Sequence, residues 1–453
     1  MTTDKGVIVT PDVCLTLARG YARILLLSVL AAVVLLMAIA PSIWTLSALA
    51  VAACLAALVY PVSGASAWVM VVPLENYVVN IIGVSPFIIL IPAVVAGMVS
   101  NMIIAERRLT GMPGARFALS LLIAFMLSAI ASDSLDIGQL RMIVSAALML
   151  IMSLSIAWSI STDELGIWVV GHASIVAAII TVYIGLGTGD VSWRIAVGDN
   201  VRLLANSVGV ALIFVVSALM QTSSKDHPTL PYQGSRASLL VIAIMCVASI
   251  AATVSRGVMA AIVIVLICSS IGSIVFNDSQ SRLRTVARNG SVLLLVAVVG
   301  IVLVPYIDQL IAGGRLMERI LLAWYNPEEN LRWTIWASAI GGMAQAEWII
   351  GSGPGTFRAL AQSAGYDFYA HSVYIDIFVS TGIIGVGVLL AYIMYVFWNV
   401  VNHKSVLGLA LCLFLLIGFV THGSASTKEF WVLLGTVSGL NYRYRIKARR
   451  IPS

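Results

Sequence analysis

Charged side chains are scarce in this sequence, and this scarcity restricts the class of protein that it can encode. Only 10% of the 453 residues are Asp, Glu, Lys or Arg, whereas 60% are hydrophobic, and the mean hydropathy is +1.02. A soluble domain carries about 25% charged residues, so this chain has too few to cover an aqueous surface. Its apolar runs approach the roughly 20 residues that a helix needs to cross a bilayer. The composition excludes a soluble protein and predicts an all-α polytopic membrane protein.

Residues that bind metals or form disulfides are also few. The chain has five cysteines and five histidines, and none of them shows the spacing of metal ligands or of a redox pair. We therefore expect no disulfide, no metal site and no cofactor. The first apolar run is followed directly by a second, so we expect no cleavable signal. No repeat of the apolar runs is apparent, which weakly disfavours a secondary transporter.

The apolar runs predict about 12–14 transmembrane helices. Two runs have an alternative interpretation as re-entrant or interfacial segments, because 62–84 is interrupted by Pro73 and Glu75 and 429–441 is short. The predicted spans are 22–40, 43–60, 62–84, 86–104, 117–132, 140–160, 166–186, 203–220, 237–254, 258–276, 290–306, 371–398, 405–421 and 429–441.

The cationic residues predict which side of the membrane each connection faces. When the loops alternate between the two sides, about two thirds of the 26 lysines and arginines fall on the side of the termini. Cytoplasmic loops carry an excess of these residues, so both termini are expected in the cytoplasm of a bacterial inner-membrane protein. The expected parts are a cytoplasmic tail (1–21), a transmembrane bundle (22–306), a large periplasmic loop (307–370), further transmembrane helices (371–441) and a basic cytoplasmic tail (442–453).

The long outer segment 307–370 has the composition of a folded structure. Loops of this length are usually functional or disordered, and this one is rich in tryptophan and tyrosine. Asn326-Pro327-Glu328-Glu329 is a typical helix start, with a cap, a proline in the first turn and two acids at the positive end of the dipole. The predicted helix carries apolar residues from Leu331 to Met343 and ends at the run Gly351–Gly355. We expect a helical cap on the outer membrane face.

Arginines on the outer side are the first candidates for a functional site. Arg256 lies in a polar interruption, Ser255-Arg256-Gly257, between two apolar spans. A charge at membrane depth is costly and is a functional hypothesis by default. The alternative is a side chain that extends from a helix turn to the membrane surface. The small residues on both sides of Arg256 favour a shaped functional turn.

Three other outer arginines are further candidates. Arg332 lies on the predicted cap helix, where a surface ion pair with Glu328 or Glu329 is the alternative role. Arg194 and Arg202 flank a short outer loop, and each is equally well explained as an interfacial anchor. If the four arginines converge, their guanidinium groups would suit a phosphate or diphosphate, which they bind bidentately.

His371 opens a span where the predicted cap joins the bundle. Histidine titrates near neutral pH and is a common general base, although an isolated histidine is more often structural. Tyr374 lies one turn further on, and Asp376 either orients part of the site or pairs with an arginine.

Two other polar features have structural alternatives. The Gly351–Gly355 run lacks the lysine, the hydroxyl residue and the preceding strand of a phosphate loop, which favours a tight turn. Glu75, near Asn76 and Asn80 in an apolar span, either packs between helices or contributes to a lipid-headgroup site.

Several motifs in this order resemble the O-antigen ligase and Wzy-type polymerase superfamily over about residues 250–390. Upstream, Arg194, Gly198 and Asn206 look like that family's Arg-x-x-x-Gly and Asn segment, while the first part of the chain is similar only in hydropathy. One departure is Ser372, where many members have asparagine. The motifs are Ser255-Arg256-Gly257, Arg332-Trp333-Thr334-Ile335-Trp336, Gly351-Ser352-Gly353-Pro354-Gly355-Thr356-Phe357, His371-Ser372-Val373-Tyr374 and Gly382-Ile383-Ile384-Gly385.

The resemblance implies a metal-independent glycosyltransferase of the GT-C type, which takes a glycan from undecaprenyl diphosphate on the periplasmic side and inverts the anomeric centre. It implies diphosphate-binding roles for Arg256 and Arg332, with Arg194 and Arg202 as further candidates. It also implies that His371 is the base that deprotonates the acceptor hydroxyl. The supporting residues would be Ser255, Trp336, Tyr374, Asp376 and Asn206.

Three functions remain open at this point. A polymerase would join one lipid-linked glycan to another, and is slightly preferred; a ligase would join the glycan to lipid A–core. A transporter or flippase would use the arginines to carry an anion without forming a bond. The expected partners are the lipid-linked donor, a glycan or lipid A–core acceptor, the bilayer and other polysaccharide-assembly proteins, but no nucleic acid.

Overall fold

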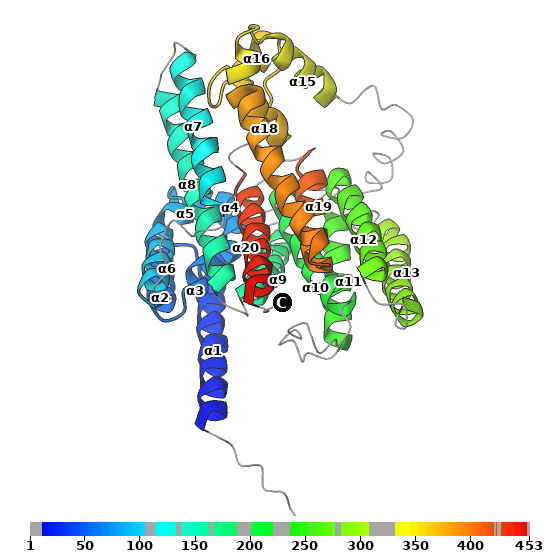
Figure 1. Ribbon diagram of the computed structural model, residues 1–453. Helices are drawn as coiled ribbons and strands as arrows, with labels where there is room; N and C mark the ends of the chain where they lie inside the picture. Colours follow the sequence, from blue (N-terminus) through cyan, green and yellow to red (C-terminus); the bar gives the residue numbers. More distant parts are fainter. Residues whose placement is uncertain are drawn as a thin grey trace, which may run out of the picture.

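In the computed structural model the described residues form helices joined by turns, without a strand among them (Figure 1). The predicted all-α fold of a polytopic membrane protein is therefore confirmed. For some residues inside the described ranges, including Arg202 and Arg256, only the backbone is described. The described residues are 11–104, 114–132, 137–162, 166–187, 201–220, 236–253, 255–276, 282–307, 331–420, 423 and 427–450.

Each predicted apolar run forms a helix or a short series of helices. The first half of the chain contains α1 (Pro11–Ile39), α2 (Ile43–Val59), α3 (Val62–Val71), η1 (Val72–Leu74), α4 (Glu75–Ile82), α5 (Pro86–Ile89), α6 (Ile91–Ile104), α7 (Ala115–Ala131), α8 (Ile137–Thr162), α9 (Gly166–Gly187) and α10 (Val201–Met220). The second half contains α11 (Arg236–Ala252), α12 (Arg256–Phe276), α13 (Arg282–Ile307), α15 (Leu331–Gly341), α16 (Glu347–Ile350), α17 (Phe357–Ser363), α18 (Val373–Asn402), α19 (Val406–Gly418) and α20 (Lys428–Arg450).

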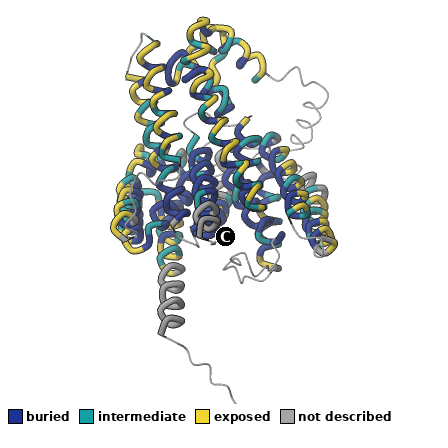
Figure 2. Tube along the Cα trace, viewed as in Figure 1, coloured by how far each residue is buried: buried dark blue, intermediate teal, exposed yellow. Residues whose placement is uncertain are grey.

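The outer surface of the bundle is apolar. Three helical segments among the described residues are long and apolar enough to cross a membrane, and they are Ile137–Ser161, Gly257–Phe276 and Val373–Asn402. Most of the other helices contain shorter apolar stretches of 10–17 described residues. Large aliphatic side chains such as Leu119 and Ile130 on α7 are exposed, while the centre of the bundle is buried (Figure 2). An apolar surface this extensive fits a lipid environment.

Contacts between helices fix their relative directions. Ser270 near the end of α12 contacts Met220 at the end of α10, and Ile262 near the start of α12 packs on Gly209 near the start of α10. Helices α10 and α12 therefore run parallel. Phe414 near the end of α19 also packs on Gly209, so α19 runs in the opposite direction.

The starts of α18 and α20 lie at the same end of the bundle as the starts of α10 and α12. The Val373 amide of α18 donates to the Phe419 carbonyl at the end of α19, at 3.2 Å. The Tyr374 ring contacts Phe430 in the first turn of α20, with centroids 6.1 Å apart. Helices α15 to α17 lie beyond this end, which we call the cap end (Figure 1). The beginning of α1 and the end of α20 lie at the opposite end of the bundle (Figure 1).

The segment 331–370, which is the described part of the predicted loop, forms a folded cap with a small core that also includes Val379 of α18. Trp336 and Met343 pack against Phe357 and Ala361 within this core. Its first helix, α15, ends at Gly341, earlier than the predicted end at Gly351, because two successive glycines weaken the helix at that point. The predicted helix start at residues 326–329 lies outside the described residues.

Several helices differ in length from their predicted spans. Helix α1 begins at Pro11, inside the segment predicted as a tail, and α13 begins at Arg282 instead of at residue 290. The run 62–84 is divided, since Pro73 lies in η1 and α4 begins at Glu75. The run 429–441 is part of a longer helix, because α20 continues to Arg450 through the segment predicted as a basic tail. Within α20, Gly435 and Gly439 are spaced as in a GxxxG motif and let the backbone approach α8 closely.

Candidate functional site

His371 lies at the junction of the cap and the bundle, and its backbone is held from both sides. It is half-buried, and its φ of 52° is in the left-handed region that few residues other than glycine adopt. The Trp336 indole donates a hydrogen bond to the preceding carbonyl, that of Ala370. The following residue, Ser372, caps α18 by accepting a hydrogen bond from the Ile375 amide at 3.4 Å. Strained backbone of this kind is often found at functional sites.

Arg332 and Trp336 share one face of α15, because they are four residues apart on a helix. Arg332 is half-buried, and Trp336 is only 6% exposed within the cap core. Trp333 packs edge-on against Trp336, with ring centroids 5.0 Å apart. Through the bond from Trp336 to Ala370, the helix that carries Arg332 is fixed to the segment that carries His371.

Tyr374 and Asp376 follow in the first turn of α18. The Tyr374 hydroxyl donates to the Leu415 carbonyl of α19 at 2.7 Å, so this side chain ties two helices together. The carboxylate of Asp376 is buried close to the N-terminal end of α18, where the helix dipole favours negative charge. Tyr374 therefore has a structural role, and Asp376 lies in the first turn of the helix that follows His371.

The starts of α10 and α12 bring the other predicted residues to the cap end. Ser255 is buried, and its carbonyl accepts from the Met259 amide at 3.0 Å, so Arg256 is the first residue of α12. Asn206 is 2% exposed, and its Oδ1 has no hydrogen-bond partner among the described residues. Arg194 and the side chains of Arg202 and Arg256 lie outside the described part of the chain. The N-terminal ends of α10, α12 and α18, which carry partial positive charge, share this end.

The glycine run Gly351–Gly355 forms a tight turn that packs against α18. A tight turn is the interpretation that the sequence favoured over a phosphate loop. Gly351 adopts a φ of 88° and lies directly on the backbone of α18, where Gly382 breaks the helix with a φ of 65°. A Cβ at either glycine would overlap the backbone of the other segment. The Ser352 amide also donates to the Val379 carbonyl at 2.8 Å. The run fixes the cap to α18.

Glu75 proves to be an interhelical contact, one of its two predicted roles. It forms a half-buried ion pair with Lys428 at the start of α20 and accepts a hydrogen bond from Ser85 at 2.6 Å. The Lys428 ammonium also lies 4.6 Å from the Phe87 ring centroid. Because the partners are separated by hundreds of residues, the pairing gave no local signal in the sequence.

Arg358, another outer arginine, has a local role in the cap. Its guanidinium donates to both carboxylate oxygens of Asp367, at 2.8 and 3.1 Å. These bonds, together with one from Gln362, hold the pKa of Asp367 below its usual range. The pair is exposed and is held within the cap rather than at the junction with the bundle.

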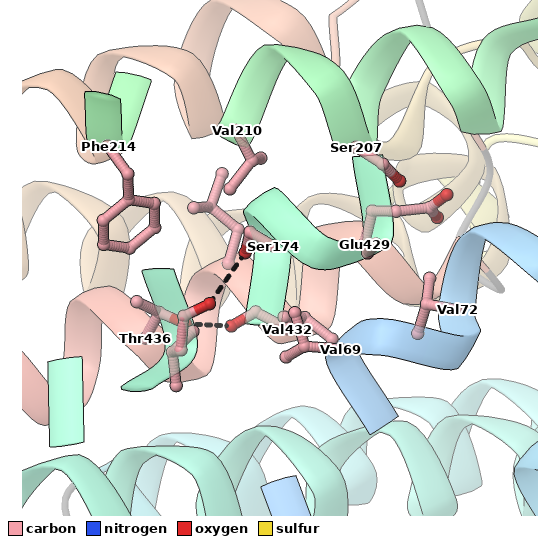
Figure 3. Close-up of a pocket in the computed structure, with 12 residues that line it drawn as sticks. Val69, Val72, Ser174, Ser207, Val210, Phe214, Glu429, Val432 and Thr436 are labelled. Carbon is pink, nitrogen blue, oxygen red and sulfur yellow. Dashed lines mark hydrogen bonds between the residues drawn. The ribbon is translucent and has the colours of Figure 1, made fainter. Parts of the chain in front are cut away.

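The sequence did not identify Glu429, which is buried near the same end. Glu429 is 5% exposed and lines a small cavity with Ser207 of α10 (Figure 3). Neither carboxylate oxygen has a hydrogen-bond partner among the described residues. An acid at the first turn of an apolar run, directly after a lysine, was the signal that could have found it.

One family model matches a part of the chain. Residues 229–390 match the family model described as O-Antigen ligase, and they extend from before α11 into α18 with all the motif residues between Ser255 and Gly385. No curated protein and no solved structure matches the chain. Ser372 differs from the asparagine found in many members, but both residues are favoured helix caps, so the cap is retained. Residues 229–390, which are less than half of the chain, are therefore similar to the O-antigen ligase family, and this similarity supports a membrane glycosyl-transfer role in the assembly of O-antigen or other surface polysaccharide.

Proposed function

We propose that the protein is a glycosyltransferase of the periplasmic face of the bacterial inner membrane. It would transfer a glycan from undecaprenyl diphosphate to a sugar hydroxyl of a second glycan, as a polymerase of O-antigen or another surface polysaccharide. The observation that carries the proposal is the meeting of the starts of α10, α12 and α18 with the cap at one end of the bundle. These segments hold Arg202, Arg256, Arg332 and His371, whereas Arg194 lies outside the described residues.

Arginines and helix starts would bind the diphosphate. When the glycosidic bond to the donor breaks, negative charge develops on the leaving diphosphate, and fixed positive groups stabilise that charge without reorganisation. Arg256 and Arg332 would supply bidentate hydrogen bonds, with Arg194 and Arg202 as further contacts. The positive ends of the helix dipoles add to this field. In this proposal no metal ion is required.

His371 would act as the general base. Its imidazole takes the proton of the acceptor hydroxyl while the hydroxyl oxygen forms a bond to the anomeric carbon of the donor sugar. The bond from that carbon to the diphosphate oxygen breaks, and the electron pair leaves with undecaprenyl diphosphate. Attack opposite to the leaving group inverts the anomeric centre. The hydrogen bond from Trp336 to Ala370 and the Ser372 cap support the role by fixing the backbone on both sides of His371.

The ligase alternative is favoured by the description of the matching family. In that case the same chemistry would transfer a glycan to lipid A–core instead of to a second lipid-linked glycan. A flippase is the alternative from another class, and it would need charges at mid-membrane depth. The described candidates Arg202, Arg256 and Arg332 lie instead at the starts of helices, the last of them in the cap.

The test is the surface glycan of a deletion strain, resolved by length on a gel. A polymerase mutant retains single repeat units on lipid A–core, a ligase mutant leaves lipid A–core bare, and complementation restores the ladder. Purified protein with an undecaprenyl-diphosphate-linked donor should form the new glycosidic bond in EDTA. A requirement for added Mg²⁺ or Mn²⁺ would contradict metal independence, and translocation of the donor without bond formation would indicate a flippase.

A further inference from the structure

Glu429 is an isolated acid in the interior of the protein. Its side chain lies in the first turn of α20 and is almost fully buried between α20, α10 and the segment around η1. Neither carboxylate oxygen has a hydrogen-bond partner among the described residues, although its own backbone N–H contributes a favourable dipole. An ionised carboxylate buried without a partner is strongly unfavourable. The group therefore requires a positive charge that the described side chains do not supply directly.

The surroundings of Glu429 provide further acceptors and few donors. The Ser207 side chain faces the same space as the Glu429 carboxylate (Figure 3). One residue earlier, Asn206 has a buried Oδ1 without a partner in the described part of the chain. The hydroxyls of Ser174 and Thr436, further along the cavity, already donate to carbonyls of their own helices. The Asn206 Oδ1 and the hydroxyl oxygens of Ser174 and Thr436 are therefore left as acceptors, and such oxygen atoms are suited to a cation.

The charged neighbours do not neutralise Glu429. Lys428, the adjacent residue, attracts the carboxylate but is engaged in the ion pair with Glu75. Glu75, which belongs to α4, repels it. The described cavity-lining side chains of α3, η1, α9 and α10 are hydroxyl or apolar groups. Among the described side chains, the acid thus experiences one cation, Lys428, which it shares with a second acid.

The cavity limits the size of the occupant. Its volume is about 30 Å³, and about 10–15 Å³ is enough for one water molecule. A proton, or a cation of the size of sodium with a water molecule, fits into this space. The Glu429 carboxylate and the mainly apolar lining disfavour an anion, so the occupant is distinct from the lipid diphosphate of the proposed reaction.

We propose that Glu429 and the adjoining cavity form a binding site for one small monovalent cation, supplied either as a proton or as Na⁺. The bound cation neutralises the carboxylate and allows α20 to pack against α10. The site lies at the cap end, near the start of α10 that carries Asn206. The packing of α20 against α10 at this end therefore depends on the local pH or Na⁺ concentration.

Thermal unfolding of the purified full-length protein tests the proposal, with intrinsic tryptophan fluorescence as the readout. One series varies NaCl against choline chloride at constant ionic strength and fixed pH. A second series varies pH in choline chloride without sodium. We expect the midpoint to rise by several degrees with Na⁺ if sodium is the occupant, or as the pH falls through the titration of Glu429 if a proton is the occupant.

Glu429→Gln is the decisive variant, because a neutral amide of the same shape imitates the occupied site. It should accumulate normally and, in the absence of the cation, unfold at or above the midpoint of the wild type. Its unfolding midpoint should no longer depend on the Na⁺ concentration or the pH, as that of the wild type does. Glu347→Gln, at a partly exposed acid of the cap, is the matched control and should keep that dependence. Ser207→Ala should raise the Na⁺ concentration needed for half of the effect several-fold if sodium binds, and leave the pH series unchanged if a proton binds.

Three results would overturn the proposal. One is a wild-type unfolding midpoint that changes neither with the Na⁺ concentration nor with the pH. The second is a Glu429→Gln variant with the same dependence as the wild type. The third is a Glu429→Gln variant that fails to accumulate, because the structure would then require the negative charge itself.

Discussion

The cap and the bundle are stabilised by different kinds of contact, although one chain forms both. The cap buries Trp336 and Phe357 in a small core and carries an exposed ion pair on its surface. The bundle exposes aliphatic side chains and brings backbones together at Gly435 and Gly439. In water, burial of apolar surface drives folding, whereas in lipid the helices associate through close packing. The candidate site lies where the two kinds of structure meet.

The largest effect is expected from a substitution that separates two helices of the bundle. A Cβ at Gly435 would overlap the backbone of Ser153 on α8. Overpacking costs about 1–3 kcal/mol where neighbours can shift, and more where the obstacle is backbone. We expect Gly435→Val to leave little folded protein in the membrane, as measured by fluorescence-detected size exclusion. Gly387→Val on α18 is the control, because nothing lies within 4 Å of that position, and equal losses in both variants would disprove the packing account.

Removal of the site arginines should abolish transfer without loss of protein. Arg256→Ala and Arg332→Ala each remove a proposed diphosphate contact, and lysine should restore little activity because it lacks the planar fork. The measurement is transfer by purified variants at matched membrane levels. Arg358→Ala is the matched control, since that arginine pairs with Asp367 within the cap. Near-normal transfer by Arg332→Ala would favour the surface ion-pair role for that residue.

A smaller effect is expected where the cap is joined to the bundle. Trp336→Phe keeps a ring in the cap core but removes the indole N–H that donates to the Ala370 carbonyl. A hydrogen bond contributes about 0.5–1.5 kcal/mol, so kcat should fall roughly 2- to 10-fold while the protein level is unchanged. Trp333→Phe, at a ring that is 63% exposed, should retain wild-type kcat. The same decrease in both variants would mean that aromatic packing, and not this hydrogen bond, fixes His371.

The smallest effect is expected on the cap surface. Arg358 holds the pKa of Asp367 below its usual range, so the pair stabilises the cap above the pKa of this carboxyl in the unfolded chain. That stability is lost as the pH falls through the lowered pKa in the folded protein. Because both groups are exposed, the contribution is small. Asp367→Asn should remove a slight acid-dependent decrease in the unfolding midpoint and leave transfer at neutral pH unchanged; a large loss of activity would assign Asp367 to the site.

The bundle was more predictable from the sequence than the contacts inside it. Helix positions follow from apolar runs, because in lipid each run must satisfy its backbone hydrogen bonds within a helix. The end of α20 was missed because its last turns are polar, yet Arg443 is 8% exposed within the protein. Hydropathy records composition and not which neighbours surround a residue.

The candidate site was predictable in its motifs but not in its geometry. Local spacing indicated His371, Arg332 and the glycine turn. The left-handed conformation of His371 and its connection to Trp336 depend on chain segments that meet only in the folded protein. The unpartnered carboxylate of Glu429 likewise became apparent only from its surroundings. Long-range pairing leaves no period in the sequence, so these features required the structure.

The role of His371 as the base at the junction of cap and bundle is tested most directly by donor binding and single-turnover transfer with purified His371→Ala and His371→Gln. Both variants should bind the undecaprenyl-diphosphate-linked donor as the wild type does, because the arginines hold the diphosphate. Transfer should fall by roughly 10²–10⁴-fold, the typical contribution of a positioned base, and wild-type activity should decrease at low pH as the imidazole is protonated. If both variants bind the donor and transfer the glycan at close to the wild-type rate, His371 is not the base and the account is contradicted.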